Sequence, residues 1–288
     1  MLCALGVVVI SPDALIIRSV STDAWTTVCW RGTFTMVGTL VMLAVLSPGR
    51  GPSPRARRLP SLAHLLAGAL FAAASVAFVT ALDRTDAASV LVIIAAGPLI
   101  ASVLGRLLLN EPTHARTWLA GIVVLVGLVV ILGGSLGRRE IDGDLLALAG
   151  ASCFAGYLTV SRAARPADMT PAIAIGGAGA AVAGLVAGAD LSIGTGDLLL
   201  LALLGVVILP VSLTLITRAT HRLPAPEVNL IALLETVLGP LWVWLALGET
   251  PSPEVLGGGV LVLGAVTIHS VLALRTGGGR DSNALVVS

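Results

Sequence analysis

The strongest constraint on this chain is an internal repeat. The segment Arg84–Glu111, RTDAASVLVIIAAGPLIASVLGRLLLNE, aligns without a gap with Arg222–Glu249, RLPAPEVNLIALLETVLGPLWVWLALGE, at an offset of 138 residues (222 − 84). The two copies are identical at Arg84/Arg222, Ala87/Ala225, Val90/Val228, Ile93/Ile231, Leu107/Leu245, Leu109/Leu247 and Glu111/Glu249. Both copies then pass through a proline turn into a glycine-spaced apolar stretch. A repeated apolar unit of this kind indicates a protein built from two related halves.

The balance of apolar and charged residues indicates whether this chain lies in water or in a membrane. Apolar residues make up 56% of the sequence and charged residues 11%, with a mean hydropathy of +1.00. A soluble domain needs more polar surface than this. The apolar runs are about 17–24 residues long without period-two alternation, which predicts transmembrane helices rather than a barrel. A net charge of +1 gives no indication of nucleic-acid binding.

Polar breaks rich in Gly and Pro divide the sequence into ten candidate spans. We expect them at 2–18, 24–46, 61–82, 86–108, 115–135, 143–162, 169–188, 196–218, 225–247 and 254–274. The first span is expected to be retained rather than cleaved as a signal peptide, because no basic leader precedes it. Residues 1–135 form the first five-helix repeat, residues 143–274 the second, and residues 275–288 a Gly-rich, flexible cytoplasmic tail.

The distribution of arginines predicts the orientation of these spans. With both termini in the cytoplasm, eleven arginines lie in cytoplasmic loops and the tail, and four lie in outer loops. The repeat agrees with this topology, since five spans per half place the two copies in opposite senses across the bilayer. The predicted fold is therefore all-α, with ten transmembrane helices as two inverted five-helix repeats around a central cavity.

Several sequence features together resemble a known family. They are Arg31 in the second span, Pro98 before Asn110-Glu111-Pro112, Leu234-Glu235-Thr236 before Gly248-Glu249, and the glycines that follow each copy. This set resembles the EamA-type branch of the drug/metabolite transporter (DMT) superfamily. Ser11-Pro12-Asp13 with Ile17-Arg18 is similar to the start of YddG-like amino-acid exporters in that branch. The resemblance implies a carrier of the bacterial inner membrane that exports amino acids, including aromatic ones, or related metabolites.

The sequence departs from the family pattern at two places. The first span has Ser11-Pro12-Asp13 where a Trp-Gly pair is common, and the ninth span has Thr236 where a proline is typical. Pro240 follows four residues later, so a kink in the ninth span is expected to be displaced.

Three ionisable side chains within the spans are candidates for substrate contact, because charge at the bilayer centre costs at least ~2.5–3.5 kcal/mol. Asp13 could bind a substrate ammonium or a proton, or serve as a structural partner of Arg31. The guanidinium of Arg31 suits a substrate carboxylate, or acts as a structural clamp. Glu235 could carry a proton or bind an ammonium group, or remain neutral and hydrogen-bonded to a neighbouring helix.

Uncharged polar side chains, aromatic rings and prolines are further candidates to line the cavity. The polar side chains can instead bond a carbonyl of their own helix. Trp30 and Tyr157 are candidates for stacking against substrate, and prolines within spans are candidates for kinks that free a carbonyl. The remaining members of this set are Ser75, Thr80, Ser89, Pro98, Ser161, Pro210, Ser212 and Asn229.

These patterns favour a secondary transporter that moves small molecules by alternating access. The alternatives are a carrier of nucleotide sugars, lipid-linked sugars or drugs, and a membrane-embedded enzyme. We expect no enzymatic activity, because the sequence has no Ser/His pairing, paired membrane aspartates or HExxH motif. Neither a metal nor a cofactor is expected, and the expected partners are a small-molecule substrate and the lipid bilayer. A monomer would suffice for this architecture.

Overall fold

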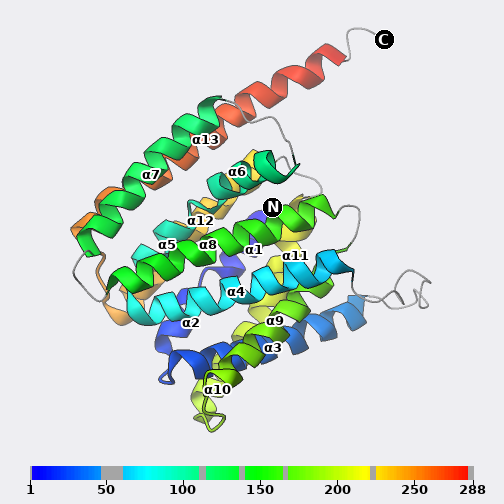
Figure 1. Ribbon diagram of the computed structural model, residues 1–288, viewed down its shortest axis with the longest axis vertical. Coiled ribbons are helices and arrows are strands. Elements are labelled where there is room, and N and C mark those ends of the chain that lie inside the picture. Colours follow the sequence, from blue (N-terminus) through cyan, green and yellow to red (C-terminus); the bar gives the residue numbers. More distant parts are fainter. Residues whose placement is uncertain are drawn as a thin grey trace.

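The computed structural model describes residues 2–46, 61–109, 115–135, 140–164, 168–220 and 225–284. All regular elements in this part of the chain are helices (Figure 1). Five segments are by length and composition apolar enough to cross a membrane: Ala24–Val45, Leu62–Arg84, Ala87–Leu108, Glu140–Ala163 and Thr195–Ile216. Shorter apolar stretches lie in the helices that remain.

The helices of the first half follow the five expected spans. The first span is α1 (Leu2–Ile10) with α2 (Asp13–Ser19), the second is α3 (Ala24–Leu46), the third is α4 (Leu62–Arg84), the fourth is α5 (Ala87–Ile94) with α6 (Gly97–Leu109), and the fifth is α7 (Ala115–Ser135). Two of the five spans are therefore interrupted near mid-membrane.

The second half repeats this order. The sixth span is α8 (Glu140–Ala163), the seventh is α9 (Thr170–Val186), the eighth is α10 (Thr195–Ala202) with η1 (Leu203–Ile208) and α11 (Leu209–Thr220), the ninth is α12 (Ala225–Leu247), and the tenth is α13 (Pro253–Ala284). The segment from residue 275, which we expected to be a flexible tail, is helical as far as Ala284. No proline interrupts α13 after its first residue, so its backbone ladder can continue.

Prolines account for the irregular points in the first and eighth spans. Pro12 separates α1 from α2, because proline has no N–H for the carbonyl four residues earlier. In the eighth span the ladder widens to the π-helix η1 just before Pro210. Such π-helical turns occur where the regular hydrogen-bond ladder cannot be kept.

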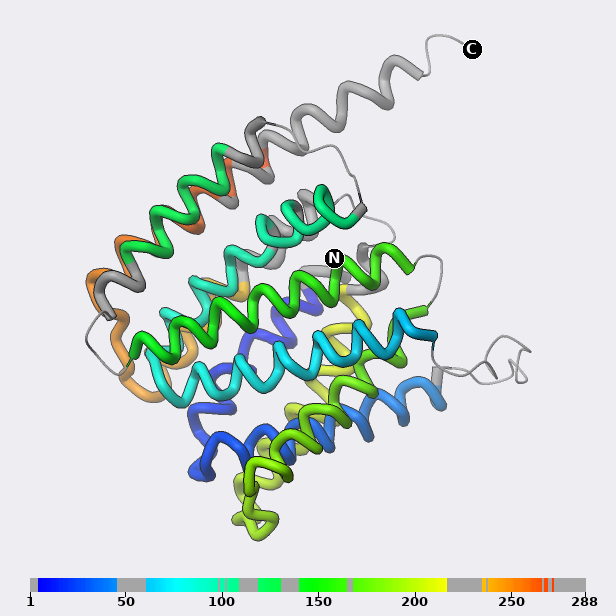
Figure 2. The backbone as a smooth tube through the Cα atoms, viewed as in Figure 1, coloured from blue at the N-terminus to red at the C-terminus, as the bar shows by residue number. Residues whose placement is uncertain are grey.

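The contacts between helices have the pattern of a two-fold exchange of the halves. Three pairs join a helix to its own counterpart: α3 with α9, α5 with α12, and α7 with α13. The helices α4 and α8 join spans three and six, and α1 and α11 join spans one and eight. Span three corresponds to span eight and span six to span one, so exchanging the two halves turns one contact into the other. Figure 2 shows α4 and α8 running side by side despite their separation in sequence. The ten-helix, two-repeat prediction is thus confirmed.

Glycines let two of the counterpart pairs approach backbone to backbone. A Cβ on Gly32 of α3 would lie 2.6 Å from the carbonyl oxygen of Gly177 in α9. A Cβ on Gly127 of α7 would lie 2.9 Å from the carbonyl oxygen of Gly258 in α13. Small residues commonly mediate such close packing between membrane helices. We refer to these contacts as the α3–α9 seam and the α7–α13 seam.

Candidate functional site

The break between α1 and α2 places a carboxylate inside the protein. The hydroxyl of Ser11 donates to the carbonyl oxygen of Val8 at 2.9 Å, which replaces the backbone donor that Pro12 lacks. Asp13 is the first residue of α2 and is buried. The proline and the serine together make a stable break whose new helix begins with an acidic side chain, as helix N-termini favour.

Arg31 on α3 is the ionic partner of this carboxylate. Its Nη2 donates to Oδ2 of Asp13 at 2.7 Å, and both side chains are more than nine-tenths buried. Its Nη1 donates to Oγ of Ser75 on α4 at 2.6 Å, and the guanidinium carbon lies 5.8 Å from the centre of the Phe78 ring. The predicted residues Asp13, Arg31 and Ser75 thus meet, and they tie together the first three spans.

The ion pair leaves two buried polar atoms of opposite kind without a hydrogen-bond partner. One is Oδ1 of Asp13, an acceptor, and the other is Nε of Arg31, a donor. An unsatisfied buried polar atom costs about 1–3 kcal/mol, so such atoms normally have a ligand or water partner in use. Glu235 of α12 also interacts electrostatically with Asp13 and brings the second repeat to this position.

Several other predicted site residues lie away from this pair. The hydroxyl of Thr80 donates to the carbonyl oxygens of Val76 and Ala77, and that of Ser212 donates to Leu209, so each bonds its own helix. The contacts of Thr80 and Ser212 match the alternative that we gave for hydroxyls in membrane helices. Ser161 lies one helical turn after Tyr157 on α8, and its buried Oγ is without a hydrogen-bond partner.

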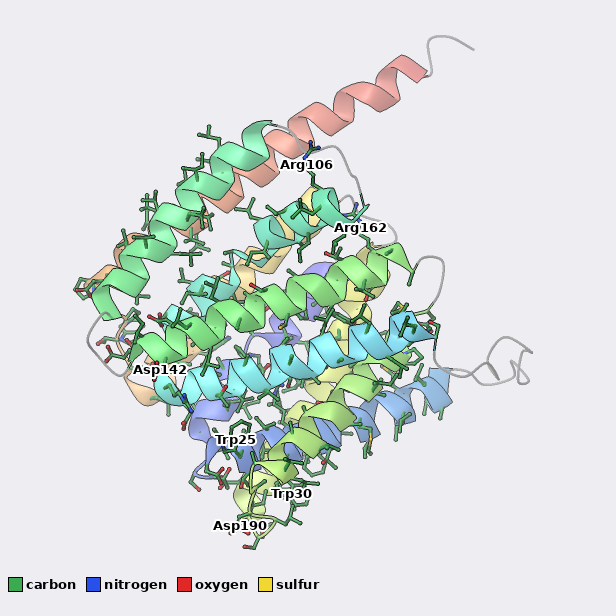
Figure 3. The ribbon with its side chains drawn as sticks, in the orientation of Figure 1. Trp25, Trp30, Arg106, Asp142, Arg162 and Asp190 are labelled. Atoms are coloured by element: carbon green, nitrogen blue, oxygen red, sulfur yellow. The ribbon has the colours of Figure 1, made fainter. Side chains whose placement is uncertain are left out.

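The two aromatic candidates also lie in other surroundings. Tyr157 packs against the rings of Phe71 and Phe154, with centroids 5.4 and 5.7 Å away. Trp30 stacks on Phe34 at 5.5 Å, and Figure 3 places it at the margin of the bundle formed by α3 and α9. Trp30 precedes Arg31 directly, but a step of one residue turns a helical side chain by about 100°.

The proline and amide candidates fall on helices of three different spans. Pro98 is the second residue of α6, just after the break at Ala95 and Ala96, and its side chain lies outside the described residues. Pro210 is buried at the start of α11. Asn229 lies on α12, and its side chain is also outside the described residues.

A second polar cluster, which the sequence did not reveal, lies where α2 and α12 end and α5 and α8 begin. We call it the Glu249 end of the bundle. Nη2 of Arg18 lies 2.8 Å from Oε1 of Glu249, and the same oxygen accepts the N–H of Ala87 at 2.8 Å. Glu249 matches Glu111 in the other copy of the repeat, and this identity was the signal available in the sequence.

The predicted residue Ser89 belongs to the same end. Its hydroxyl donates to Oδ1 of Asp144 at 2.6 Å, and the hydroxyl of Thr85 donates to that oxygen at 2.9 Å. Thr85 and Ser89 flank the start of α5, and Asp144 lies in the second turn of α8. Ser89 therefore joins the two repeats at this end and does not contact the Asp13–Arg31 pair.

Burial and neighbouring charge alter the acidity of the loops at this end. Burial raises the pKa of Asp86, which precedes α5, and the negative charges of Glu249 and Glu140 raise it further. The opposite holds for Asp23 before α3, where hydrogen bonds from Thr26 and Trp25 lower the pKa. Within the described residues, no group of three or more His, Cys, Asp or Glu side chains could hold a metal ion.

Comparisons with known proteins identify the family. A family model described as the EamA-like transporter family matches residues 2–133 and again residues 141–271. The chain belongs to the EamA-like transporter family. The two matched segments coincide closely with the two five-helix halves of the EamA fold. The first part of our resemblance is confirmed, and with it a membrane transporter of the DMT superfamily.

One solved structure extends this likeness over the whole fold. A chain described as "Crystal structure of protein" is similar with a TM-score of 0.66 and 21% sequence identity, covering 95% of this chain and 97% of that one. A search of curated proteins finds no match. The comparisons thus support a transporter of this family and the ten-helix fold.

Proposed function

We propose that this transporter exports amino acids across the bacterial inner membrane by alternating access, and that the zwitterionic part of the cargo binds at the Asp13–Arg31 pair. The observation that carries the proposal is the pair of orphaned atoms, Oδ1 of Asp13 and Nε of Arg31. An ammonium group can donate to the first, and a carboxylate can accept from the second. An α-amino acid carries both groups on neighbouring atoms.

The surroundings of the pair support this assignment over phosphate-bearing cargo. Among the described residues, Arg31 is the one arginine that is buried. Sugar nucleotides carry several negative charges, and their binding would need several such cations. Glu235 interacts with Asp13, and its carboxyl group offers further oxygens that can accept from an ammonium group. The break beside Asp13 also fits substrate sites of secondary transporters, which commonly form at discontinuous helices.

Transport into liposomes tests the cargo directly. Purified protein in liposomes should take up radiolabelled amino acids faster than empty liposomes, and excess unlabelled amino acid should compete. The variants D13N and R31K should lose most of this uptake, because each removes one of the two complementary contacts. R106Q changes an exposed arginine at the end of α6 and serves as the matched control.

The outcomes separate the alternatives. Uptake of nucleotide sugars or cationic drugs without uptake of any amino acid contradicts the proposed cargo and favours the other carrier class. Uptake that D13N and R31K leave unchanged contradicts the proposed binding site. Running the panel with and without a proton gradient identifies coupling to protons.

The proposed topology has its own test. Both termini and residues 50–58 are placed in the cytoplasm, and residues 138–144 outside. Single cysteines introduced in these two loops should therefore react with an impermeant maleimide from opposite faces of the membrane, and labelling of 50–58 from outside whole cells contradicts the topology.

A further inference from the structure

We infer that the last turns of α12 and the turn after it form a gate at the Glu249 end, held closed by two contacts with the first repeat. One contact joins Glu249 to Arg18, and the other joins Trp242 to Ser11. Because Ser11 lies just before α2 and Arg18 lies in its last turn, the two contacts hold this short helix at both ends. We call this pair of contacts the clasp.

Glu249 makes the outer half of the clasp through a single carboxylate oxygen. This oxygen accepts from Nη2 of Arg18 and from the N–H of Ala87, both at 2.8 Å. The same Nη2 also donates to the carbonyl oxygen of Thr85 at 3.0 Å. One ion pair therefore joins α2, the start of α5 and the turn after α12, and charge at the N-terminus of α5 adds to its stability.

The backbone at Gly248 directs Glu249 to this position. Gly248 has φ +72°, the left-handed conformation that glycine adopts readily at helix ends. Its N–H closes the last turn of α12 on the carbonyl of Trp244 at 2.9 Å. The chain thus turns sharply after α12, so that Glu249 reaches α2 and α5 instead of continuing along the helix axis.

Trp242 makes the inner half of the clasp at the break of the first span. Its Nε1 donates to Oγ of Ser11 at 3.0 Å, and this hydroxyl in turn donates to the carbonyl of Val8. Ser11 therefore needs its hydroxyl proton for the break and its lone pair for Trp242. The indole of the second repeat thereby supports the break that places Asp13.

The position and exposure of the clasp fit a gate rather than a permanent contact. Both side chains of the Arg18–Glu249 pair are about a quarter exposed, whereas those of the Asp13–Arg31 pair are almost fully buried. Water can therefore replace the outer contacts as they open. The residues Asp86, Ala88, Pro240, Val243, Glu249 and Pro251 line a crevice beside the clasp, between α5 and α12, that is too tight to hold a water molecule. Opening the clasp would widen this crevice.

The gate can be measured without any cargo. Ala88 is buried and lines the crevice, so A88C, in a background with the native cysteines replaced by alanine, reports opening through its reaction with a water-soluble maleimide. In purified protein, E249Q and W242F should each raise this rate about three- to tenfold, because loss of one polar contact shifts a two-state equilibrium by that order. D142N removes an exposed carboxylate nearby on α8 and should leave the rate unchanged (Figure 3).

Two further variants make the result decisive. R18Q with E249Q should raise the rate no more than the larger single effect, because both remove one ion pair. The exchange R18E with E249R restores the charges but not the acceptor for Ala87, so its rate should fall below that of E249R alone, which lacks the same acceptor and also repels Arg18. Equal rates for E249Q and wild type, an equal rise in D142N, or no slowing by the charge exchange each overturn the clasp. Failure of amino-acid transport alone leaves this assay intact and contradicts only the proposed function.

Discussion

The two copies of the repeated segment fold differently at the same depth in the protein. The first copy is interrupted between α5 and α6, at Ala95 and Ala96, whereas the second runs through α12 without a break. Gly97 and Pro98 follow the interruption, and their counterparts in the second copy are Glu235 and Thr236. One copy therefore loses its helical ladder at mid-membrane, and the other carries a carboxylate there.

The second copy shows that a proline alone does not break these helices. Pro240 lies inside α12, which continues to Leu247. A glycine precedes the proline in both copies, as Gly97-Pro98 and as Gly239-Pro240, so the Gly-Pro pair permits the interruption in the first copy without determining it. The comparison teaches that the halves share their topology but divide the roles, since the second copy supplies Glu235 to the Asp13–Arg31 pair of the first half.

The largest expected effect on stability distinguishes the buried Asp13–Arg31 pair of the first half from Glu235 of the second half. D13A leaves the guanidinium of Arg31 buried without its ionic partner and should lower the free energy of unfolding by about 3–5 kcal/mol. E235Q keeps the shape and hydrogen-bonding capacity of its side chain and should lower it far less. Thermal unfolding in detergent measures both. D13A combined with R31A should be less harmful than D13A alone, and equal losses for D13A and E235Q contradict this division of roles.

A pair of glycines tests the packing of the two copies. A Cβ on Gly239 in α12 would lie 2.4 Å from Cδ1 of Leu91 in α5, whereas the position of a Cβ on Gly97 has no atom within 4 Å. G239A should therefore destabilise the protein by about 1 kcal/mol, because the clash is with the end of a flexible side chain that can turn aside. G97A should be nearly neutral in the same unfolding measurement. L91A should partly rescue G239A, and a G97A loss as large as that of G239A would refute the assignment.

The smallest expected effect concerns the residue just before the first helix of each copy. This residue is Asp86 before α5 in the first copy and Pro224 before α12 in the second. Since the pKa of Asp86 is raised, its ionised form is disfavoured in the folded protein, and D86N should raise the melting temperature by about 1–2 °C at neutral pH. This difference should fade as the pH falls through the raised pKa and disappear below about 3.9, the ordinary pKa of aspartate.

Asp23 provides a control of opposite sign. Its pKa is lowered by hydrogen bonds at the start of α3, so D23A should reduce stability at neutral pH by roughly 1 kcal/mol, the usual effect of losing such a cap. The stabilisation by Asp23 is complete above the ordinary pKa and is lost as the pH falls through the lowered one. A melting curve that shifts in the same direction for D86N and D23A at pH 7 contradicts the two assignments.

The sequence was sufficient for the order and bounds of the spans. The expected spans 24–46, 115–135 and 225–247 coincide with α3, α7 and α12 to the residue. Apolar length, prolines and arginine-rich turns decide these bounds locally, so no tertiary information is needed. Pro98 was a candidate kink site in the fourth span, but a full interruption was not predicted, because glycine and proline permit a break without determining whether neighbouring helices will stabilise it.

The candidate site was predictable only where charge forced a pairing. Asp13 and Arg31 lie 18 residues apart, and each needs an opposite charge within the membrane, so their contact was among our alternatives. The pair Arg18 and Glu249 is 231 residues apart and lies at the end of the bundle, where water offers either residue another partner. Its formation depends on the turn at Gly248 and on how the halves meet.

The two glycine seams bear on the route by which a molecule could reach the interior. At the α3–α9 seam and the α7–α13 seam the helix backbones themselves are in contact, so the acyl chain of a lipid cannot pass between them. Lateral portals from the bilayer are thereby closed along two faces of the protein. A water-soluble molecule that enters at an end of the bundle meets neither seam. The packing of the helices therefore admits solutes from water while it excludes, along these two faces, molecules dissolved in the membrane.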